Sequence, residues 1–385
     1  MRAFPALLIS ALLFTATADE PLVVFFIDPT AYDYSGDAML VRTPGGRHFV
    51  IDGGMRSTYF PTWDCGAQRV LPLLDSLEVT YLEGVVGTHQ DADHIGGLIS
   101  VYENMPVGTA YDTGWPYGGT WTYEEYLEAI MENGADYVIP RRGDVLDWGP
   151  DITVEVLHPV EPLSPSSTNN SSIVIRLTYD EVSFLFTGDL ETNGGEDVVL
   201  AALSSGEIDD ISADVLKVGH HGSFTSTCTQ WLAAVDPSIA AICVGAGNPY
   251  GHPHDEVVQR IQGRGIDIYR TDIHGTFYIS SDGQGVYYNA MPPEGGDPQP
   301  VDGFAVYPSP ATAQANFSWD TDRGDECVIS VYNLNGERVL EVRASGGLHT
   351  WDLGTEGGLA SPGLYAAVFL PEGGEPYTEY FTVSR

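Results

Sequence analysis

The segment at residues 88–97, THQDADHIGG, constrains the fold and the chemistry of this chain more than any other stretch. It holds four potential metal ligands within six positions, namely His89, Asp91, Asp93 and His94. The apolar run at residues 82–87 predicts a short buried strand before it, and residues 95–98 predict the start of a helix after it. The four side chains are therefore expected on a strand-to-helix loop, where they can point to one spot.

The chemistry of these side chains indicates the kind of site. Imidazole and carboxylate together suit zinc or manganese, and the absence of cysteine from the segment argues against a closed structural zinc site. A second interpretation is a polar loop whose acids cap the following helix, with His89 and His94 as ordinary surface residues. The rest of the chain favours the metal site, because similar residues follow other apolar runs.

Three further apolar runs end in polar side chains of the same kinds. Residues 184–189 form a predicted strand that ends in Asp189, and residues 215–223 repeat the layout with two adjacent histidines in the sequence GHHGS. Asp52 follows the apolar residues 49–51 in the same way. Strands that deliver ligands at one edge of a sheet are how a binuclear metal site is assembled on such a scaffold.

In this order the motifs resemble the metallo-β-lactamase superfamily. More narrowly, the chain resembles the hydrolase domain of the ComEC family of DNA-uptake proteins. The narrower resemblance rests first on Asp91, an aspartate where the HxHxDH motif has its second histidine. It also rests on three further segments, namely NNSS at 169–172, LKVGHHGS at 216–223 and NPYGHPH at 248–254. It covers residues 22–282 and implies an α/β fold, the αββα metallo-β-lactamase sandwich, with two metals at one edge.

The resemblance also implies how the ligands are shared between the two ions. His89 and Asp91 would bind one metal, while Asp93 and His94 would bind the other. Asp189 would bridge the two metals. The implied cofactors are two divalent metal ions, zinc or manganese.

Two ligand positions stay open in this assignment. The second metal needs a histidine from the GHHGS segment, and His220 and His221 are both candidates. The first metal takes a third histidine in the wider superfamily, but the equivalent position here falls on Asn169 or Asn170, of which Asn170 is kept as the candidate. An amide oxygen is a weaker ligand than imidazole, so this site is expected to bind loosely or to prefer manganese.

Two such cations can hold a bridging hydroxide that attacks a phosphoryl or carbonyl centre. Asp91 or Asp93 is then expected to orient the nucleophile. His252 and His254 lie in a Gly/Pro-rich loop and are candidate catalytic residues, either as contacts to a substrate oxyanion or as proton donors to the leaving group. A rigid turn with two solvated histidines is the alternative for this pair.

Lys217 is the only lysine of the chain and lies in the strand that leads to GHHGS. A buried structural role and a contact to a substrate phosphate both stay open. Strand alternation predicts that its side chain points away from the metals.

Residues 1–18 fit a secretory signal peptide. Arg2 precedes an apolar run at residues 6–14, and Ala16-Thr17-Ala18 predicts cleavage after Ala18. No other run approaches the ~18 apolar residues that span a bilayer, so no transmembrane segment is expected. The chain is therefore expected to be secreted or held at the cell surface, with residues 19–290 as its hydrolase domain.

The composition changes after residue 290. Residues 291–302 are rich in proline and glycine, which predicts a linker. Residues 303–385 show short alternating strands, which predicts a small all-β Ig-like sandwich. Segments such as YPSP at 307–310 and SPGLY at 361–365 resemble the sorting domains of the type IX secretion system and the FlgD-type Ig-like domain. The resemblance implies the secretion machinery as a partner, and a carbohydrate- or protein-binding module is the alternative.

The net charge of −38, from 54 acidic and 16 basic residues, limits the class of substrate. Proteins that hold long DNA neutralise its phosphates with lysine and arginine, and this chain offers only local clusters such as Arg141 and Arg142. We therefore expect a phosphodiester or nucleic-acid substrate that is short or small.

Two further features have structural alternatives. Cys228 and Cys243 are the first pair to test for a disulfide, and Cys327 is a candidate buried thiol. Five aromatic residues of one segment form either a lid over the active site or the packing face of a helix, namely Trp115, Tyr117, Trp121, Tyr123 and Tyr126.

Three functions fit the sequence. The favoured one is a secreted binuclear metal-dependent hydrolase, a phosphodiesterase or nuclease-like enzyme. The second keeps the site and changes the substrate to a lactone, a thioester or a β-lactam. The third is a non-enzymatic surface binding protein, which the presence of the bridging acid Asp189 disfavours.

Overall fold

The computed structural model describes residues 21–31, 35–58, 62–115, 120–162, 165–288, 304–307, 315–319, 326–333, 338–346, 348–355, 358–360, 363–371 and 377–383. The predicted signal peptide at residues 1–18 and the predicted linker at residues 291–302 lie outside these ranges, as does Tyr117 of the predicted aromatic lid. Both segments stay predictions.

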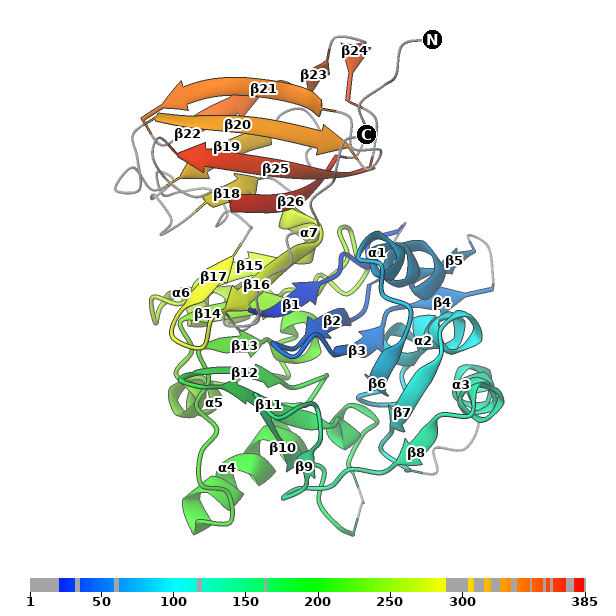
Figure 1. The fold of residues 1–385 in the computed structure, drawn as a ribbon. Coiled ribbons are helices and arrows are strands. Elements are labelled where there is room, and N and C mark those ends of the chain that lie inside the picture. The colour runs from blue at the N-terminus through cyan, green and yellow to red at the C-terminus, as the bar shows by residue number, and fades with distance from the viewer. Residues whose placement is uncertain are drawn as a thin grey trace.

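Two large sheets form the body of the hydrolase region (Figure 1). The first has the order β17-β16-β1-β2-β3-β6-β7-β8. Its strands are β1 (Leu22–Phe26), β2 (Ala38–Arg42), β3 (His48–Gly53), β6 (Leu82–Val86), β7 (Val107–Tyr111), β8 (Asp136–Val138), β16 (Phe277–Ser281) and β17 (Val286–Tyr288). Pairing changes from antiparallel to parallel at β3, so β3, β6, β7 and β8 all end at one edge.

The second sheet has the order β15-β14-β13-β12-β11-β10-β9. Its strands are β9 (Val145–Leu146), β10 (Thr153–His158), β11 (Val174–Tyr179), β12 (Val182–Phe186), β13 (Val215–Lys217), β14 (Ile239–Ile242) and β15 (Asp267–Arg270). Strands β12 to β15 are parallel, and β12 and β13 are buried at every position. Such continuous burial is typical of strands covered on both faces.

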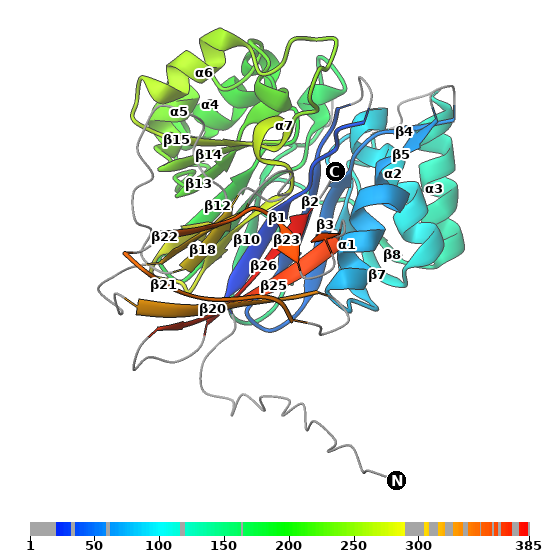
Figure 2. The same ribbon diagram turned by 90° about the horizontal axis from the view of Figure 1, so that it is seen from above.

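Helices cover the outer face of each sheet, and the two sheets pack against each other (Figure 2). The helices are α1 (Leu71–Ser76), α2 (Ala92–Asn104), α3 (Trp121–Asn133), α4 (Asp197–Ser205), α5 (Thr229–Val235), α6 (Asp255–Gln262) and α7 (Thr271–His274). Short elements complete the region, namely β4 (Arg56–Ser57), β5 (Trp63–Asp64), η1 (Gly66–Val70), η2 (Asn169–Ser171), η3 (Thr192–Glu196) and η4 (Gly219–Gly222).

Three hydrophobic clusters correspond to these layers. One lies between the sheets and includes Phe26, Phe49 and Phe184. A second joins the first sheet to α1, α2 and α3, and a third joins the second sheet to α4, α5 and α6. The predicted αββα sandwich is therefore confirmed.

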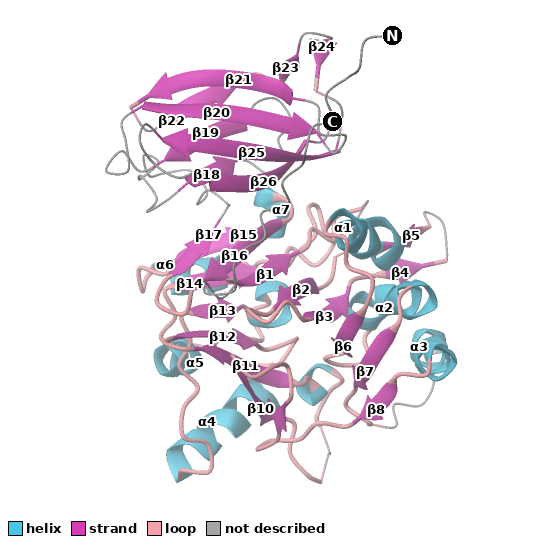
Figure 3. Cartoon of the chain, in the orientation of Figure 1, coloured by secondary structure: helices cyan, strands magenta, loops and turns pink. Residues whose placement is uncertain are grey.

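The described C-terminal residues form only strands (Figure 3). They are β18 (Phe304–Tyr307), β19 (Ala315–Trp319), β20 (Glu326–Asn333), β21 (Arg338–Ser345), β22 (Leu348–Trp351), β23 (Gly354–Thr355), β24 (Gly358–Leu359), β25 (Gly363–Pro371) and β26 (Tyr377–Val383). The sheets β18-β19-β22 and β21-β20-β25-β26 contribute to one buried cluster that includes Phe317, Ile329, Trp351 and Phe369. The expected small all-β unit is present, and its Ig-like and sorting character stays a prediction.

Several smaller expectations can be compared with the structure. Cys228 and Cys243 are free thiols, so the disulfide considered between them is absent, and Cys327 is a buried free thiol as expected. Tyr123 and Tyr126 pack α3 into the core, whereas Trp121 is 82% exposed. Tyr123 and Tyr126 therefore pack the helix, and the lid stays a prediction for the other aromatic residues of the segment. No helix within the described ranges is long and apolar enough to cross a membrane.

Candidate metal centre

The site lies at the edge where strands of both sheets end. From the first sheet, β6 leads into the loop that carries His89 and Asp91, and α2 then presents Asp93 and His94 in its first turn. From the second sheet, β12 leads to Asp189. The adjacent strand β13 leads to two histidines in the turn η4.

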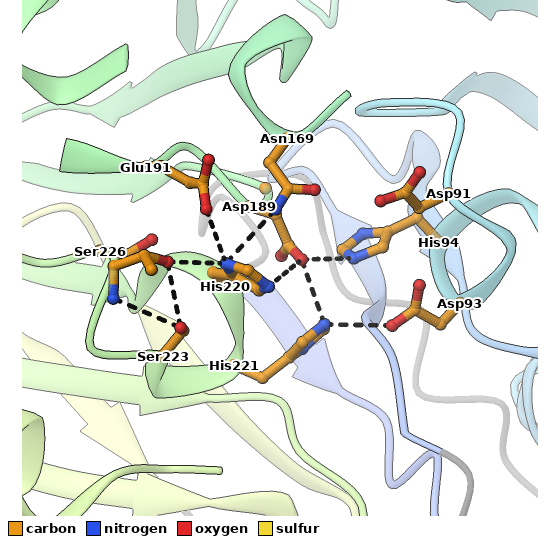
Figure 4. Close-up of polar contacts among 12 residues, drawn as sticks. Asp91, Asp93, His94, Asn169, Asp189, Glu191, His220, His221, Ser223 and Ser226 are labelled. Atoms are coloured by element: carbon orange, nitrogen blue, oxygen red, sulfur yellow. Dashed lines mark hydrogen bonds and ion pairs between the residues drawn. The ribbon is translucent and has the colours of Figure 1, made fainter. Parts of the chain in front are cut away.

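Four buried residues form a group that could hold a metal ion, namely Asp37, His94, Asp189 and His221. One ligand atom from each lies within 4.8 Å of the others, and no second group of three or more such residues is found in the described part of the chain. Asp189 is central to the group. Its Oδ2 lies 3.2 Å from His94 Nε2 and 3.3 Å from His221 Nε2 (Figure 4).

Two further predicted ligands border this group. Asp93 Oδ2 lies 3.3 Å from His221 Nε2, and His220 Nε2 lies 3.7 Å from Asp189 Oδ2 (Figure 4). Both histidines of the GHHGS segment therefore reach Asp189, and His221 is the one inside the buried group. The two have positive φ angles of 50° and 52°, which turn the chain sharply after β13 so that adjacent side chains reach the same acid.

The charges in the group are strongly coupled. Burial raises the pKa of Asp189, but His221 and His94 outweigh burial and hold this pKa well below its usual range. Burial lowers the pKa of both histidines, but carboxylates, Asp189 first, outweigh it and hold their pKa values well above the usual range. Histidines must lose their protons to bind a metal, so metal binding here should weaken as the pH falls.

Asp37 was not among the residues singled out from the sequence. It directly precedes β2, whereas the predicted ligands all follow strands. Because β2 is antiparallel to β3, with Ala38 opposite Gly53, the start of β2 lies at the edge where β3 ends. Asp37 Oδ1 lies 3.0 Å from His221 Nδ1 as a result. The signal that could have identified Asp37 is a Gly-Asp pair directly before an apolar run, when that run forms a strand antiparallel to a ligand-bearing strand.

Lys217 differs from its predicted orientation. Its buried ammonium forms an ion pair with Asp37, lies 3.9 Å from Asp189 Oδ1 and donates a 3.1 Å hydrogen bond to the carbonyl oxygen of Gly188. Alternation places it on the same side of β13 as Val215, which packs between the sheets. The ligand group lies at that inter-sheet edge, so the prediction that Lys217 points away was wrong. Its buried structural role is confirmed.

Asp52 supports the site from behind. Its Oδ2 lies 2.8 Å from His94 Nδ1, and its carboxylate accepts hydrogen bonds from the backbone N–H and the hydroxyl of Thr88 at 2.8 and 2.7 Å. A carboxylate against the second ring nitrogen fixes the orientation of a ligand histidine. Asp52 therefore positions His94 rather than entering the ligand group itself.

Glycines allow α2 to approach the end of β3. The Gly97 N–H donates a 2.8 Å hydrogen bond to the carbonyl oxygen of Gly54. A Cβ atom on Gly97 would overlap the carbonyl oxygen of Gly53 and press on the backbone nitrogen of Gly66. This close backbone contact brings the first turn of α2, with Asp93 and His94, to the edge where the strands end.

The residues predicted for the first metal are less tightly grouped. His89 Nε2 lies 3.5 Å from Asp91 Oδ2, and Asp91 also accepts a hydrogen bond from Thr168 at 3.3 Å. The amide of Asn169 lies 3.4 Å from His220 Nδ1. The amide of Asn170, in contrast, bonds Ser166 in its own loop and the backbone of Glu191 and Asn193 in the loop that follows β12. The structure therefore brings Asn169, and not Asn170, toward the predicted ligands.

His252 and His254 lie beside the turn η4. The ring of His252 is 5.5 Å from that of His220 and 6.2 Å from that of His221. Burial, followed by the charge of these two histidines, lowers the pKa of His252 to about 4. His254 Nδ1 accepts a 3.2 Å hydrogen bond from the backbone N–H of Phe224. The loop thus places His252 against the candidate ligands and uses His254 to hold the adjacent backbone.

The two arginines considered for phosphate binding are engaged elsewhere. Arg141 pairs with Glu161 and donates to the carbonyl oxygen of Thr113 at 3.0 Å. Arg142 pairs with Glu207 at 3.1 Å and donates to the carbonyl oxygen of Leu157 at 2.9 Å. Arg142 therefore connects its loop to β10 of the second sheet, and Arg141 joins the loops that follow β7 and β10.

The polar atoms of the group are suited to a divalent cation. His94 Nε2 and His221 Nε2 lie within ion-pair distance of Asp189 Oδ2 but not in hydrogen-bond geometry, and the buried Asp189 Oδ1 has no hydrogen-bond partner within the described residues. Leaving such buried atoms unmatched is costly. Imidazole and carboxylate are donors that zinc and manganese accept.

Comparison with known proteins agrees with this geometry. A family model described as "Metallo-beta-lactamase superfamily" matches residues 31–246, and the chain belongs to this superfamily. It is 32% identical over 274 residues to ComE operon protein 3 of Bacillus subtilis (strain 168), covering 67% of this chain and 33% of that protein. It is 33% identical over 241 residues to Competence protein ComA of Neisseria gonorrhoeae, covering 62% and 30%. The resemblance to ComEC-type proteins is thereby confirmed.

The chain spans about a third of the length of these curated relatives. Among solved structures, it is similar to a protein titled "Crystal Structure of a New Diphosphatase from the PhnP Family", with a TM-score of 0.36 and 13% identity. That match covers 64% of this chain and 94% of the other.

Proposed function

We propose that this chain is a metal-dependent phosphodiesterase that acts on small phosphodiesters or short nucleic acids. The observation that carries the proposal is the buried group of Asp37, His94, Asp189 and His221 at the edge of a metallo-β-lactamase sandwich. The substrate class is supported by the relatives, one of which is named a competence protein. Superfamily membership alone leaves the substrate open.

We assign two ion positions of unequal strength. Asp93, His94, Asp189 and His221 would hold the tighter ion. Three of these residues belong to the buried group, and its fourth member, Asp37, already pairs with Lys217, whereas Asp93 lies beside His221. His89 and Asp91 would hold a weaker one, and Asn169, whose amide lies beside His220, is a better candidate for it than Asn170, whose amide is engaged elsewhere. Zinc and manganese both suit these donors. When bound, such ions supply a Lewis acid and a nucleophilic water at neutral pH.

The protein residues then position the reacting groups. Asp189 lies between ligands from both sheets, so its removal would disconnect His94 from His221. His252 has a pKa of about 4, so at neutral pH its ring is uncharged and suits a hydrogen-bonding contact to a substrate oxygen better than proton donation. Asp91, whose side chain is 36% exposed beside His89, suits orientation of the nucleophile.

The charge of the molecule favours small substrates. With a net charge of −38, long polyanions are repelled at a distance. The only lysine is buried against Asp37, and Arg141 and Arg142 pair with glutamates, so none of these three neutralises a passing phosphate backbone.

A substrate panel tests this function. Metal-stripped protein is reloaded with zinc or manganese and offered bis(p-nitrophenyl) phosphate, short single- and double-stranded DNA, a lactone, a thioester and a β-lactam. We expect metal to restore cleavage of the phosphodiesters in the wild type and this cleavage to be lost in Asp189→Asn. Asp209→Asn, the same substitution at an exposed acid, should retain it. Cleavage of the lactone, thioester or β-lactam alone would support the alternative hydrolase, and no turnover would favour a binding protein.

We also propose export, with the C-terminal β unit as the part that the secretion machinery recognises. The proposal is supported by the signal-like pattern of residues 1–18 and by the sorting-domain resemblance of residues 303–385. Expression in a host with a type IX system, with and without residues 303–385, tests it. Retention of the truncated chain inside the cell is expected, and equal export of both chains would contradict the sorting role.

A further inference from the structure

Two large aromatic side chains stand exposed beside the candidate metal centre. Phe224 is 58% exposed and Tyr250 is 70% exposed. Single exposed apolar residues are common on protein surfaces and need no explanation by themselves. These two differ because each packs against a histidine of the site through one ring contact.

Tyr250 extends the site outward through His252. The rings of Tyr250 and His252 are stacked at 5.7 Å with an interplanar angle of 24°. His252 in turn stacks on His221, a member of the buried group, at 6.2 Å and 29°. Three roughly parallel rings therefore lead from the candidate ligand to the solvent, and the outermost ring leaves most of its surface free.

Phe224 lies in the loop that follows η4 and contacts the loop of His252 and His254. Its ring meets that of His254 edge-on at 5.0 Å, and His254 lies 4.8 Å from His252. Backbone hydrogen bonds fix this arrangement, from Phe224 N to His254 Nδ1 at 3.2 Å and from His254 N to the Gly222 carbonyl oxygen at 2.9 Å. The two loops are thus tied together next to η4, which fixes the backbone of Phe224 beside His254.

The charge of the chain makes such rings important for binding. A substrate held through its phosphates needs cations, and the chain carries 54 acidic against 16 basic residues. Base stacking on aromatic side chains supplies binding energy that does not depend on charge and tolerates any base sequence. Stacking also requires bases that are not already paired within a duplex.

We propose that Tyr250 and Phe224 form a stacking platform for unpaired nucleobases that flank the phosphodiester held at the metal centre. This inference rests on the proposed phosphodiesterase function and narrows its substrates to those that carry bases. Tyr250 and Phe224 are specificity residues in this assignment, because they connect to the candidate ligands through the rings of His252 and His254.

The test compares a short oligothymidylate with an abasic oligomer of the same length and the same phosphates. Metal-loaded wild type should have a higher kcat/KM for the oligothymidylate, mainly through KM. Tyr250→Ala and Phe224→Ala should each reduce this preference by about tenfold, which corresponds to about 1.4 kcal/mol. Tyr250→Phe should keep it. Tyr81→Ala should also keep it, because this 46% exposed tyrosine precedes β6, at the opposite end from the site.

Binding measured without turnover separates this inference from the proposed function. Fluorescence anisotropy of the two labelled oligomers should show the same preference, retained at raised salt and lost in Tyr250→Ala. Equal binding and cleavage of both oligomers by wild type, or a preference unchanged in the Tyr250→Ala/Phe224→Ala double variant, would overturn the stacking platform. Preferential binding of oligothymidylate with no cleavage of either oligomer would refute the phosphodiesterase and leave the platform standing.

Discussion

Replacing Lys217 with methionine gives a quantitative test of how the site is built. The side chains of Lys217 and Asp37 are both fully buried and form an ion pair, and Lys217 also donates to the carbonyl oxygen of Gly188 at 3.1 Å. Methionine keeps the length and the apolar stem but removes the charge. Asp37 would then be a buried carboxylate whose nearest remaining partner is His221 Nδ1 at 3.0 Å.

The expected cost follows from burial. Breaking a buried ion pair by removing one partner destabilises a protein by about 3–5 kcal/mol. Because His221 still faces Asp37, we expect Lys217→Met to lie near the lower end, at about 3 kcal/mol. Asp37→Asn in the same protein should offset much of this loss, since the double variant leaves no unpaired buried charge.

Urea unfolding of metal-stripped protein at pH 7 measures these free energies of unfolding. The fluorescence of the buried Trp148 and Trp231 in the hydrolase region reports the transition. Arg264→Met is the matched control, because Arg264 pairs with Asp236 at the surface and should cost less than about 1 kcal/mol. A loss below about 1 kcal/mol for Lys217→Met, or additive losses in the double variant, would refute the reasoning.

Two further predictions concern the folded hydrolase region. Burial lowers the pKa of His158 to about 4, below the ordinary value of 6.5, so the folded state binds fewer protons and its stability falls by about 3 kcal/mol as the pH drops from 6.5 to 4. His158→Asn keeps a donor toward the Ser172 carbonyl oxygen and should remove that part of the pH dependence in urea titrations, and an unchanged slope would contradict it. Gly97→Ala should destabilise the protein by about 1–3 kcal/mol and weaken metal binding, because its Cβ would push α2 off the end of β3. Gly45→Ala, at an exposed turn, should change neither, and equal thermal unfolding of the two variants would contradict the close contact.

Much of the site could be predicted because polar residues follow apolar runs. The strands β6, β12 and β13 were each recognisable as short apolar segments, and each is followed by the expected acid or histidine. Parallel strands that end at one edge bring such residues together regardless of their distance along the chain. That rule required no knowledge of side-chain packing.

The residues that were missed depend on pairing between strands. Asp37 belongs to the site because β2 runs antiparallel to β3, and the sequence of β2 alone does not state its partner. The orientation of Lys217 depends on which side of β13 faces the other sheet, which alternation within one strand leaves open. For Asn169 and Asn170, a short helical turn decides which amide faces His220, and adjacent identical residues give no signal.

Calorimetric titration of metal-stripped protein with zinc and with manganese at pH 7 tests the central claim most directly, namely that Asp189 joins ligands from both sheets into one metal site. We predict saturable binding to wild type with release of protons, at least about tenfold weaker binding to Asp189→Asn, and unchanged binding to Asp209→Asn. No binding of either metal to wild type, or equal affinity in Asp189→Asn, would contradict the account.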